Sequence, residues 1–271
     1  MATTQRRETF LPDFLAGQTA IITGGGTGLG FGIAQALSRF GANVVLTARK
    51  LERLEAAAER IRATGGQALA VQCDIRDAEQ VERMVQQTED TFGRIHMLVN
   101  NAGATFFSKA EDLSPNGWRS IIDIDINGTF LCSQAVAKRM IRDGGGAMVV
   151  ITNATPGSGN PYRTNGGAGK AALAAMVRSL AVEWGGYGIR INEVGPGSIP
   201  TEAMGAMGEN AEDAAARIPL GRVGTPADVA DATLFLMSDA ASFLTGTRIV
   251  VDGGASAGAP RHESAAGPTA G

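Results

Sequence analysis

The sequence has few of the residues that bind metals or form disulfides. Its 271 residues include two cysteines, Cys73 and Cys132, and two histidines, His96 and His262. A disulfide scaffold needs more cysteines, and a zinc site built from Cys or His needs more ligands than the chain supplies. We therefore expect neither a disulfide framework nor a metal centre.

An excess of charge of one sign and long apolar runs are also lacking. The chain carries 24 Lys and Arg against 27 Asp and Glu, a net charge of −3 that is too small and too scattered for a surface that binds nucleic acid or a membrane. No apolar stretch reaches about 18 residues, so no membrane-spanning helix is expected. The N-terminal residues MATTQRRETF lead into no apolar signal core, which favours a cytoplasmic protein.

Apolar residues and glycine are abundant. Hydrophobic residues make up 44% of the chain, enough for a sizeable core, which excludes intrinsic disorder of the whole chain. Glycine occurs 37 times, about twice its usual share. That share predicts several places where the backbone approaches another backbone segment or a ligand.

Short apolar runs alternate with longer segments of helical periodicity. The runs that predict strands are 19–23, 43–47, 68–72, 97–100, 147–152, 189–194 and 248–251. The helical segments lie near 28–40, 51–63, 77–92, 116–142, 168–186 and 226–238. Most of the strands are apolar on both faces, as in a sheet that is covered on two sides. The alternation predicts an α/β fold, a single-domain Rossmann-type doubly wound parallel sheet of about seven strands with helices on both faces.

No change of composition divides the chain, so we expect one domain over 15–254. An N-terminal extension (1–14) precedes it, and a flexible tail rich in Ala, Gly and Pro (255–271) follows. Ligands of open α/β sheets bind beyond the carboxyl ends of the strands, so the irregular stretches 101–115, 153–167 and 195–225 are expected to line the pocket. Residues 201–218 are helix-prone, and either a substrate lid or a plain surface helix fits them.

A run of glycines follows the first expected strand and precedes the first expected helix. Its members are Gly24, Gly25, Gly26, Thr27, Gly28, Leu29 and Gly30. Glycines let the backbone turn tightly and approach a pyrophosphate, and a helix N-terminus supplies free N–H groups and the positive end of its dipole. This placement favours a dinucleotide site over a purely structural turn.

Four motifs in this order resemble those of the classical short-chain dehydrogenase/reductase family, and the resemblance covers about 15–254. Residues 23–30 resemble its TGxxxGhG motif, 73–75 the segment whose Asp meets the adenine amino group, 100–103 its NNAG motif, and 196–201 the PGxIxT segment that holds the nicotinamide carboxamide. By this resemblance the cofactor is held by Gly24, Thr27, Gly28, Leu29, Gly30, Asp74, Ile75, Asn101, Ala102, Gly103, Lys170, Pro196, Gly197, Ile199 and Thr201.

The end of the second expected strand indicates which nicotinamide cofactor is used. An acidic residue there would accept the ribose 2′-hydroxyl and reject a phosphate. Here the chain has Ala48, followed by Arg49 and Lys50. Since an Arg pairs with a phosphate through two hydrogen bonds, we predict NADP(H); the alternative is that both cations simply begin a solvated helix.

The catalytic set of the family is only half present. The resemblance assigns the family Asn to Asn127, in DIDINGTF, and the family Lys to Lys170. The Tyr expected four residues before Lys170 is Gly166, and the Ser expected thirteen residues earlier is Asn153. Reduction of a ketone needs a proton donor for the alkoxide, and loss of a general acid costs roughly 10²–10⁴ in rate. Reduction of a conjugated C=C bond instead needs donors for an enolate oxygen, while water can protonate the carbon.

Within the family the chain looks most similar to the 2,4-dienoyl-CoA reductases and the peroxisomal-type trans-2-enoyl-CoA reductases, in which the Tyr of YxxxK is commonly absent. Matching stretches include residues 73–77 (CDIRD), 113–118 (LSPNGW) and 123–130 (DIDINGTF). An NADPH-dependent reductase of an activated C=C bond, such as that of a dienoyl- or enoyl-CoA, is therefore the leading hypothesis. The resemblance implies a small-molecule substrate, for example an acyl thioester. It also implies a homotetramer or homodimer.

Other groups remain candidates for proton transfer. Tyr162 lies in a loop expected at the site, although an aromatic packed on that loop fits equally well. Asp125 lies two residues before Asn127, and an Asp at the matching place is implicated in the peroxisomal dienoyl-CoA reductases. Asn153 could donate to an enolate oxygen. A carbonyl reductase with an unusual proton donor, and a cofactor-binding protein without turnover, are the alternative functions.

Overall fold

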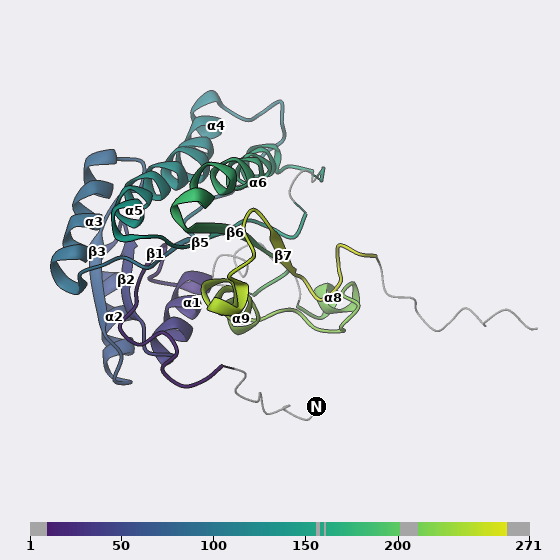
Figure 1. The fold of residues 1–271 in the computed structure, drawn as a ribbon. Helices are drawn as coiled ribbons and strands as arrows, with labels where there is room; N and C mark the ends of the chain where they lie inside the picture. Colours follow the sequence, from purple (N-terminus) through teal and green to yellow (C-terminus); the bar gives the residue numbers. More distant parts are fainter. Residues whose placement is uncertain (1–9, 156–157, 160, 201–210, 259–271) are drawn as a thin grey trace, which may run out of the picture.

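A seven-stranded parallel sheet forms the centre of the computed structural model, which describes residues 10–155, 158–159, 161–200 and 211–258 (Figure 1). The strand order is β3-β2-β1-β4-β5-β6-β7, and every pairing is parallel. The strands are β1 (Thr19–Thr23), β2 (Asn43–Ala48), β3 (Ala68–Gln72), β4 (Met97–Asn100), β5 (Gly146–Ile151), β6 (Ile189–Pro196) and β7 (Arg248–Val251).

Helices cover both faces of this sheet. They are α1 (Gly28–Arg39), α2 (Leu51–Arg62), α3 (Ala78–Phe92), α4 (Pro115–Ile122), α5 (Thr129–Asp143), α6 (Thr164–Trp184), α8 (Ala211–Ala216) and α9 (Pro226–Met237). One core cluster packs α1, α2 and α9 against one face, and a second packs α3, α5 and α6 against the other (Figure 1). This is the doubly wound Rossmann-type arrangement that the alternation predicts, so the predicted fold class is confirmed.

Local sequence explains where these elements begin. The inner strands are apolar on both faces because both faces are covered, and all five residues of β1 are buried. Asp77 caps α3 by accepting hydrogen bonds from the backbone N–H groups of Glu79 and Gln80. Thr225 and Asp228 form a capping box at the start of α9.

The helix predicted over 116–142 is interrupted by a π-helical stretch at Asp123–Gly128. The wider turn lies between α4 and α5 and changes which side chains face inward. Asp125 is completely buried, whereas Asn127 is exposed. Single π-turns inside α-helices often occur at functional sites, and this one contains the two side chains that the sequence singles out.

The chain before β1 packs onto the domain. The Phe10 and Phe14 rings stack with centroids 5.2 Å apart, and both contact Phe40 at the end of α1. Of the segment considered as a lid, 201–210 lies outside the described residues and 211–216 forms α8. Of the expected tail, 259–271 also lies outside them.

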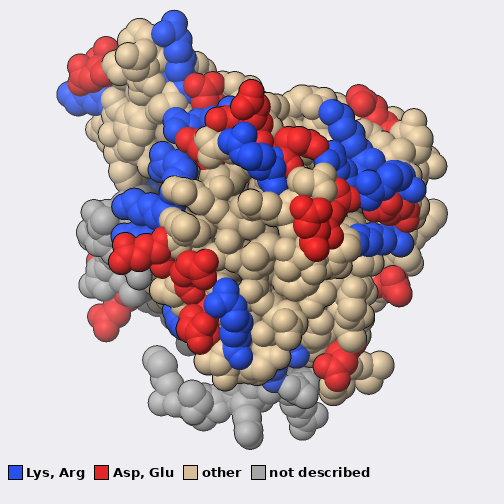
Figure 2. All heavy atoms as spheres, turned by 90° about the vertical axis from the view of Figure 1, so that its left-hand side faces the viewer, with Lys and Arg blue, Asp and Glu red and all other residues tan. Residues whose placement is uncertain are grey.

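Charges of both signs are interspersed on the face that carries α2 and α3 (Figure 2). Arg62 lies within 3.4 Å of Glu55 and 3.1 Å of Glu59, and Arg83 lies 3.6 Å from Glu79. In the part of the chain that the structure describes, no helix is long and apolar enough to cross a membrane, and no cluster of His, Cys, Asp or Glu could hold a metal ion.

Candidate active site

The strand order reverses between β1 and β4, which are neighbours in the sheet although their connections run in opposite directions. A crevice at such a point is where ligands bind in this fold. Thr23 ends β1, and its Oγ1 accepts hydrogen bonds from the N–H groups of Asn101 and Ala102, each at 3.0 Å. The Asn101 amide donates to the Thr23 carbonyl at 2.9 Å. The residues after β4 are thereby tied to the glycine turn after β1.

The glycine turn is shaped to bring backbone close to a ligand. Gly24 and Gly28 have φ angles of +66° and +55°, which side chains disfavour. A Cβ at Gly30 would lie 2.5 Å from Asn101 Nδ2 and would also overlap the Gly24 carbonyl oxygen. Thr27 precedes α1 without a side-chain capping bond, and the first turn holds no acidic residue. The backbone N–H groups of that turn therefore suit a phosphate, and this cradle fits a dinucleotide.

The adenosine side is charged. Arg76 holds the Asp74 carboxylate through Nε at 2.9 Å and Nη2 at 2.5 Å, and this hydrogen bonding lowers the pKa of Asp74 below its ordinary value. Arg49 contributes to the same lowering of the pKa and is exposed beside Lys50, after β2. The Ile75 side chain packs against Gly128, because a Cβ on Gly128 would lie only 2.6 Å from it.

The segment after β6 is held between neighbouring strands. The Pro196 carbonyl accepts from Ala154 N at 2.8 Å, and Gly197 N donates to the Val251 carbonyl at 2.9 Å. Ile199 is buried. Thr201, the last residue of the motif, lies outside the described residues.

Lys170 and Asp125 form the ionic centre of the site. Lys170 Nζ lies 3.5 Å from Asp125 Oδ2 and donates to the Ile151 carbonyl at 3.4 Å. Asp125 Oδ1 accepts from Ala104 N at 2.9 Å. Gly103 leaves the space for this pair, because a Cβ there would lie 2.9 Å from Lys170 Nζ and 3.1 Å from Asp125 Oδ1.

Asn127 does not join this group. Its side chain is exposed, and its Nδ2 donates to Asp123 Oδ1 at 2.9 Å. The π-helical turn rotates Asn127 outward and places Asp125, two residues earlier, beside Lys170. Asp125 rather than Asn127 therefore lies beside Lys170, and the assignment of the family Asn to Asn127 stays a prediction.

Asn153 follows β5. Its side-chain Oδ1 is buried and has no hydrogen-bond partner among the described residues. Its carbonyl accepts a hydrogen bond from Arg248. An amide held at the end of β5 is placed at the carboxyl edge of the sheet, where the substrate is expected.

Tyr162 lies in the loop before α6. It has a φ of +65° and is 56% exposed, and its carbonyl accepts from Ser108 N at 3.0 Å. Within the described part of the chain its hydroxyl makes no hydrogen bond to Lys170 or Asp125. The next residue, Arg163, stacks over the Phe107 ring at 4.6 Å, so the loop 101–109 contacts residues 161–163.

Thr105 is a neighbour of the site that the sequence did not reveal. A Cβ at Gly166, where the family carries Tyr, would lie 2.5 Å from Thr105 Oγ1. The side chain of this exposed loop residue therefore fills part of the space beside Gly166. Thr105 stands two residues after the NNAG match, and no local pattern indicates that it would contact α6.

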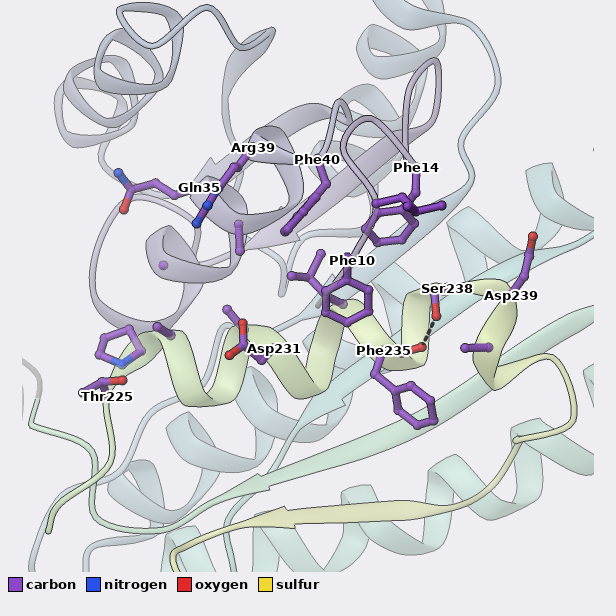
Figure 3. A pocket seen from close by; sticks show the side chains of 18 residues that line it. Phe10, Phe14, Gln35, Arg39, Phe40, Thr225, Asp231, Phe235, Ser238 and Asp239 are labelled. Atoms are coloured by element: carbon purple, nitrogen blue, oxygen red, sulfur yellow. Dashed lines mark hydrogen bonds between the residues drawn. The ribbon is translucent and has the colours of Figure 1, made fainter. Parts of the chain in front are cut away.

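A wide groove of about 1170 Å³ lies elsewhere, between the N-terminal segment, α1 and α9 (Figure 3). Phe10, Phe14 and Phe40 line one side, and Phe235 and Asp231 of α9 line the other (Figure 3). None of the residues expected in the site lines this groove.

Comparison with known proteins agrees with this geometry. The profile of the family described as enoyl-(acyl carrier protein) reductase matches residues 24–256. The peroxisomal 2,4-dienoyl-CoA reductase [(3E)-enoyl-CoA-producing] of Danio rerio is 41% identical over 251 residues, which cover 91% of this chain and 84% of that protein. The enzyme of the same name from Arabidopsis thaliana is 37% identical over 265 residues, covering 93% of this chain and 89% of that protein.

Solved structures are similar along almost the whole chain. A short chain dehydrogenase from Bacillus anthracis has a TM-score of 0.82 at 41% identity and covers 89% of this chain and 97% of its own. A gluconate 5-dehydrogenase from Burkholderia cenocepacia, solved in complex with NADP and tartrate, has a TM-score of 0.86 at 31% identity, with 90% and 98% covered. With a glycine turn at the switch point of a parallel sheet and a lysine on α6, this chain belongs to the short-chain dehydrogenase/reductase family of oxidoreductases.

Proposed function

We propose that this protein is an NADPH-dependent reductase of a C=C bond conjugated to a thioester, as in a dienoyl- or enoyl-CoA. The observation that carries the proposal is the composition of the site: Lys170 is present and lies beside Asp125, while Gly166 and Asn153 stand where the family places Tyr and Ser. Such a site can still bind the cofactor, but it lacks the acid that usually protonates the alkoxide formed when a ketone is reduced. The relatives named as 2,4-dienoyl-CoA reductases support the same substrate class.

The cofactor is held by the residues that the sequence selects. When bound, NADPH supplies a hydride. The turn at 24–30 receives the pyrophosphate, and Asp74 accepts from the adenine amino group. Arg49 and Lys50, exposed at the end of β2, pair with the 2′-phosphate. Lys170 holds the ribose hydroxyls of the nicotinamide half.

The remaining groups stabilise charge on the substrate. Addition of hydride to the conjugated carbon leaves negative charge on the thioester oxygen, and hydrogen-bond donors placed there lower the barrier. The Asn153 amide and the Lys170 ammonium are the donors in this proposal. Asp125 acts through Lys170 by holding its Nζ at 3.5 Å, so it is a positioning residue. Water delivers the proton to carbon.

The mouth of the site has apolar and basic groups together. Phe106 and Phe107 are exposed on the loop after β4, and Arg163 stacks on Phe107. Lys109 is exposed on the same loop. This combination suits an acyl thioester whose carrier ends in phosphates, since cations pair with phosphate and the rings contact apolar parts of the carrier.

The test is the oxidation of NADPH at 340 nm with a 2,4-dienoyl-CoA, a trans-2-enoyl-CoA and a panel of ketones. We expect turnover of the conjugated thioesters and none of the ketones. Turnover of ketones alone would replace this proposal by a carbonyl reductase, for which Tyr162→Phe tests the donor. Tight NADPH binding without any turnover would favour a binding protein.

For the whole chain, we propose a single reductase domain over 15–254, a cytoplasmic location and assembly into a homotetramer. Exposed apolar side chains on α6 and before β7, Val182 and Phe243, support the assembly because such side chains are commonly covered by a second subunit.

A further inference from the structure

A charged pair lies inside the parallel sheet, where neighbouring side chains are apolar. Glu193 on β6 and Arg248 on β7 are partners in register, and Glu193 is 1% exposed. Arg248 Nε lies 3.9 Å from Glu193 Oε2, and Thr152 Oγ1 donates to the same oxygen at 3.3 Å. Burying a charged pair costs free energy that an apolar pair of similar size would not cost. The pair is therefore expected to have a role other than stabilising the sheet.

Arg248 also binds the backbone that follows β5. Its Nη2 donates to the carbonyl oxygens of both Asn153 and Ala154. Consecutive carbonyls of an extended strand point to opposite sides, so one nitrogen can bind both only where the chain leaves the extended conformation. The bend begins directly after the last ladder contacts, in which Thr152 N donates to the Val194 carbonyl and Ala154 N to the Pro196 carbonyl.

Gly195 provides the space for this arrangement. A Cβ at Gly195 would lie 2.6 Å from the Asn153 carbonyl oxygen and 2.9 Å from Arg248 Nη2. Its φ is not positive, so it is the close approach of these groups that requires glycine here. Arg248 and Gly195, from two strands, thus lie against the backbone that follows β5, and Glu193 lies beside Arg248.

We infer that Glu193, Arg248 and Gly195 form a positioning device that fixes the backbone at Asn153 and Ala154 and thereby holds the Asn153 amide at the reaction site. Glu193, 3.9 Å away, lies close enough to balance the charge of Arg248, and Arg248 holds the two carbonyls. None of the three contacts the Lys170–Asp125 pair in the described structure, so they act through Asn153. The inference rests on the proposed function, in which the Asn153 amide is a donor to the substrate.

The kinetic test compares two variants that keep the charges balanced. Arg248→Lys keeps a cation beside Glu193 but loses the fork that reaches both carbonyls. The double variant Glu193→Val with Arg248→Val replaces the pair by apolar side chains, a change that folds tolerate. In both we expect kcat to fall about 10- to 100-fold, as for a misplaced catalytic group, with the KM for NADPH within about twofold of the parent. Arg62→Met is the control, because Arg62 also binds carboxylates and a backbone carbonyl, that of Ala68, but lies on α2.

A second readout needs no turnover. Amide hydrogen exchange of peptides that contain Ala154 should become at least about tenfold faster in Arg248→Lys, while the amides of β5 exchange as in the parent. Unchanged exchange at Ala154, or a kcat within about twofold of the parent in the double variant, would overturn the inference. If the parent protein reduces none of the thioesters, the proposed substrate is wrong, and the exchange measurement still tests the positioning device.

Discussion

Asp125 and Asn127 stand two residues apart and have opposite surroundings. Asp125 is fully buried and accepts a backbone hydrogen bond while it faces Lys170, whereas Asn127 is exposed and bonds to Asp123. The difference follows from one wide helical turn. The carboxylate that lies beside Lys170 is therefore that of Asp125.

Asp125→Asn should lower kcat about 10²-fold, because the Lys170 ammonium loses the carboxylate that holds it in place. Asn127→Ala should leave kcat within about twofold of the parent, since it removes only an exposed hydrogen bond. Steady-state kinetics with NADPH and a 2,4-dienoyl-CoA measures both. A large loss in Asn127→Ala together with a small one in Asp125→Asn would support Asn127, and not Asp125, as the catalytically important residue of this turn.

The two thiols are protected by burial. Burial raises the pKa of Cys73 from its ordinary value of 9.0 to about 11, and it raises that of Cys132 further. Thiolate is the reactive form, so at pH 8 neither thiol of the native protein should react quickly with a disulfide reagent such as DTNB. Two thiols should react after denaturation.

The same shift in pKa has a consequence for stability. The unfolded Cys73 thiol ionises near pH 9.0, whereas the native thiol stays protonated to about pH 11. The native state therefore binds the proton more tightly, and its free energy of unfolding should fall as the pH rises through this window. Urea unfolding at pH 8 and pH 10 measures the change, and Cys73→Ala should reduce it.

At the scale of secondary structure, the turn between β1 and α1 has little room for an added side chain. A Cβ at Gly30 would overlap the Gly24 carbonyl and approach Asn101 Nδ2 to 2.5 Å. Both neighbours belong to the links that tie the turn to the end of β4. The turn and the end of β4 must therefore move together if either is displaced.

Gly30→Ala should weaken NADPH binding at least about tenfold, because the cradle opens even though alanine favours helix by about 1 kcal/mol over glycine. The dissociation constant from NADPH fluorescence measures this. Gly185→Ala serves as the control, since a Cβ there would meet nothing within 4 Å. Equal NADPH affinity in the two variants would contradict the assignment of the cradle.

At the scale of the whole molecule, the exposed apolar side chains indicate association. Val182 is 85% exposed on α6, and Phe243 is fully exposed. If the protein is the proposed tetramer, Val182→Lys should shift it to smaller species, because a charge in an apolar interface loses its hydration. Light scattering coupled to gel filtration measures the mass, with Val182→Ala as the milder control. A monomeric parent protein would contradict the expected assembly.

Local patterns were sufficient for the elements of the fold. The strands over 19–23, 68–72, 97–100 and 248–251 lie where the apolar runs predict them. The inner strands β1 and β4 are buried along their whole length, since a strand covered on both faces is largely apolar. The helix over 164–184 begins four residues earlier than expected, where three glycines weaken the local signal. The glycine turn could also be predicted from the sequence, because a tight turn before a helix leaves few alternatives to glycine.

The sequence by itself therefore determined the order of strands and helices, the glycine cradle, and the absence of Tyr and Ser from the catalytic set. Each of these depends on residues that are close together in the chain. Only the tertiary structure decided that Asp125 rather than Asn127 faces Lys170, that Thr105 lies against Gly166, and that Arg248 reaches the carbonyls of Asn153 and Ala154. These contacts join segments separated by tens of residues, and they depend on strand register and on one helical turn, neither of which has a local pattern.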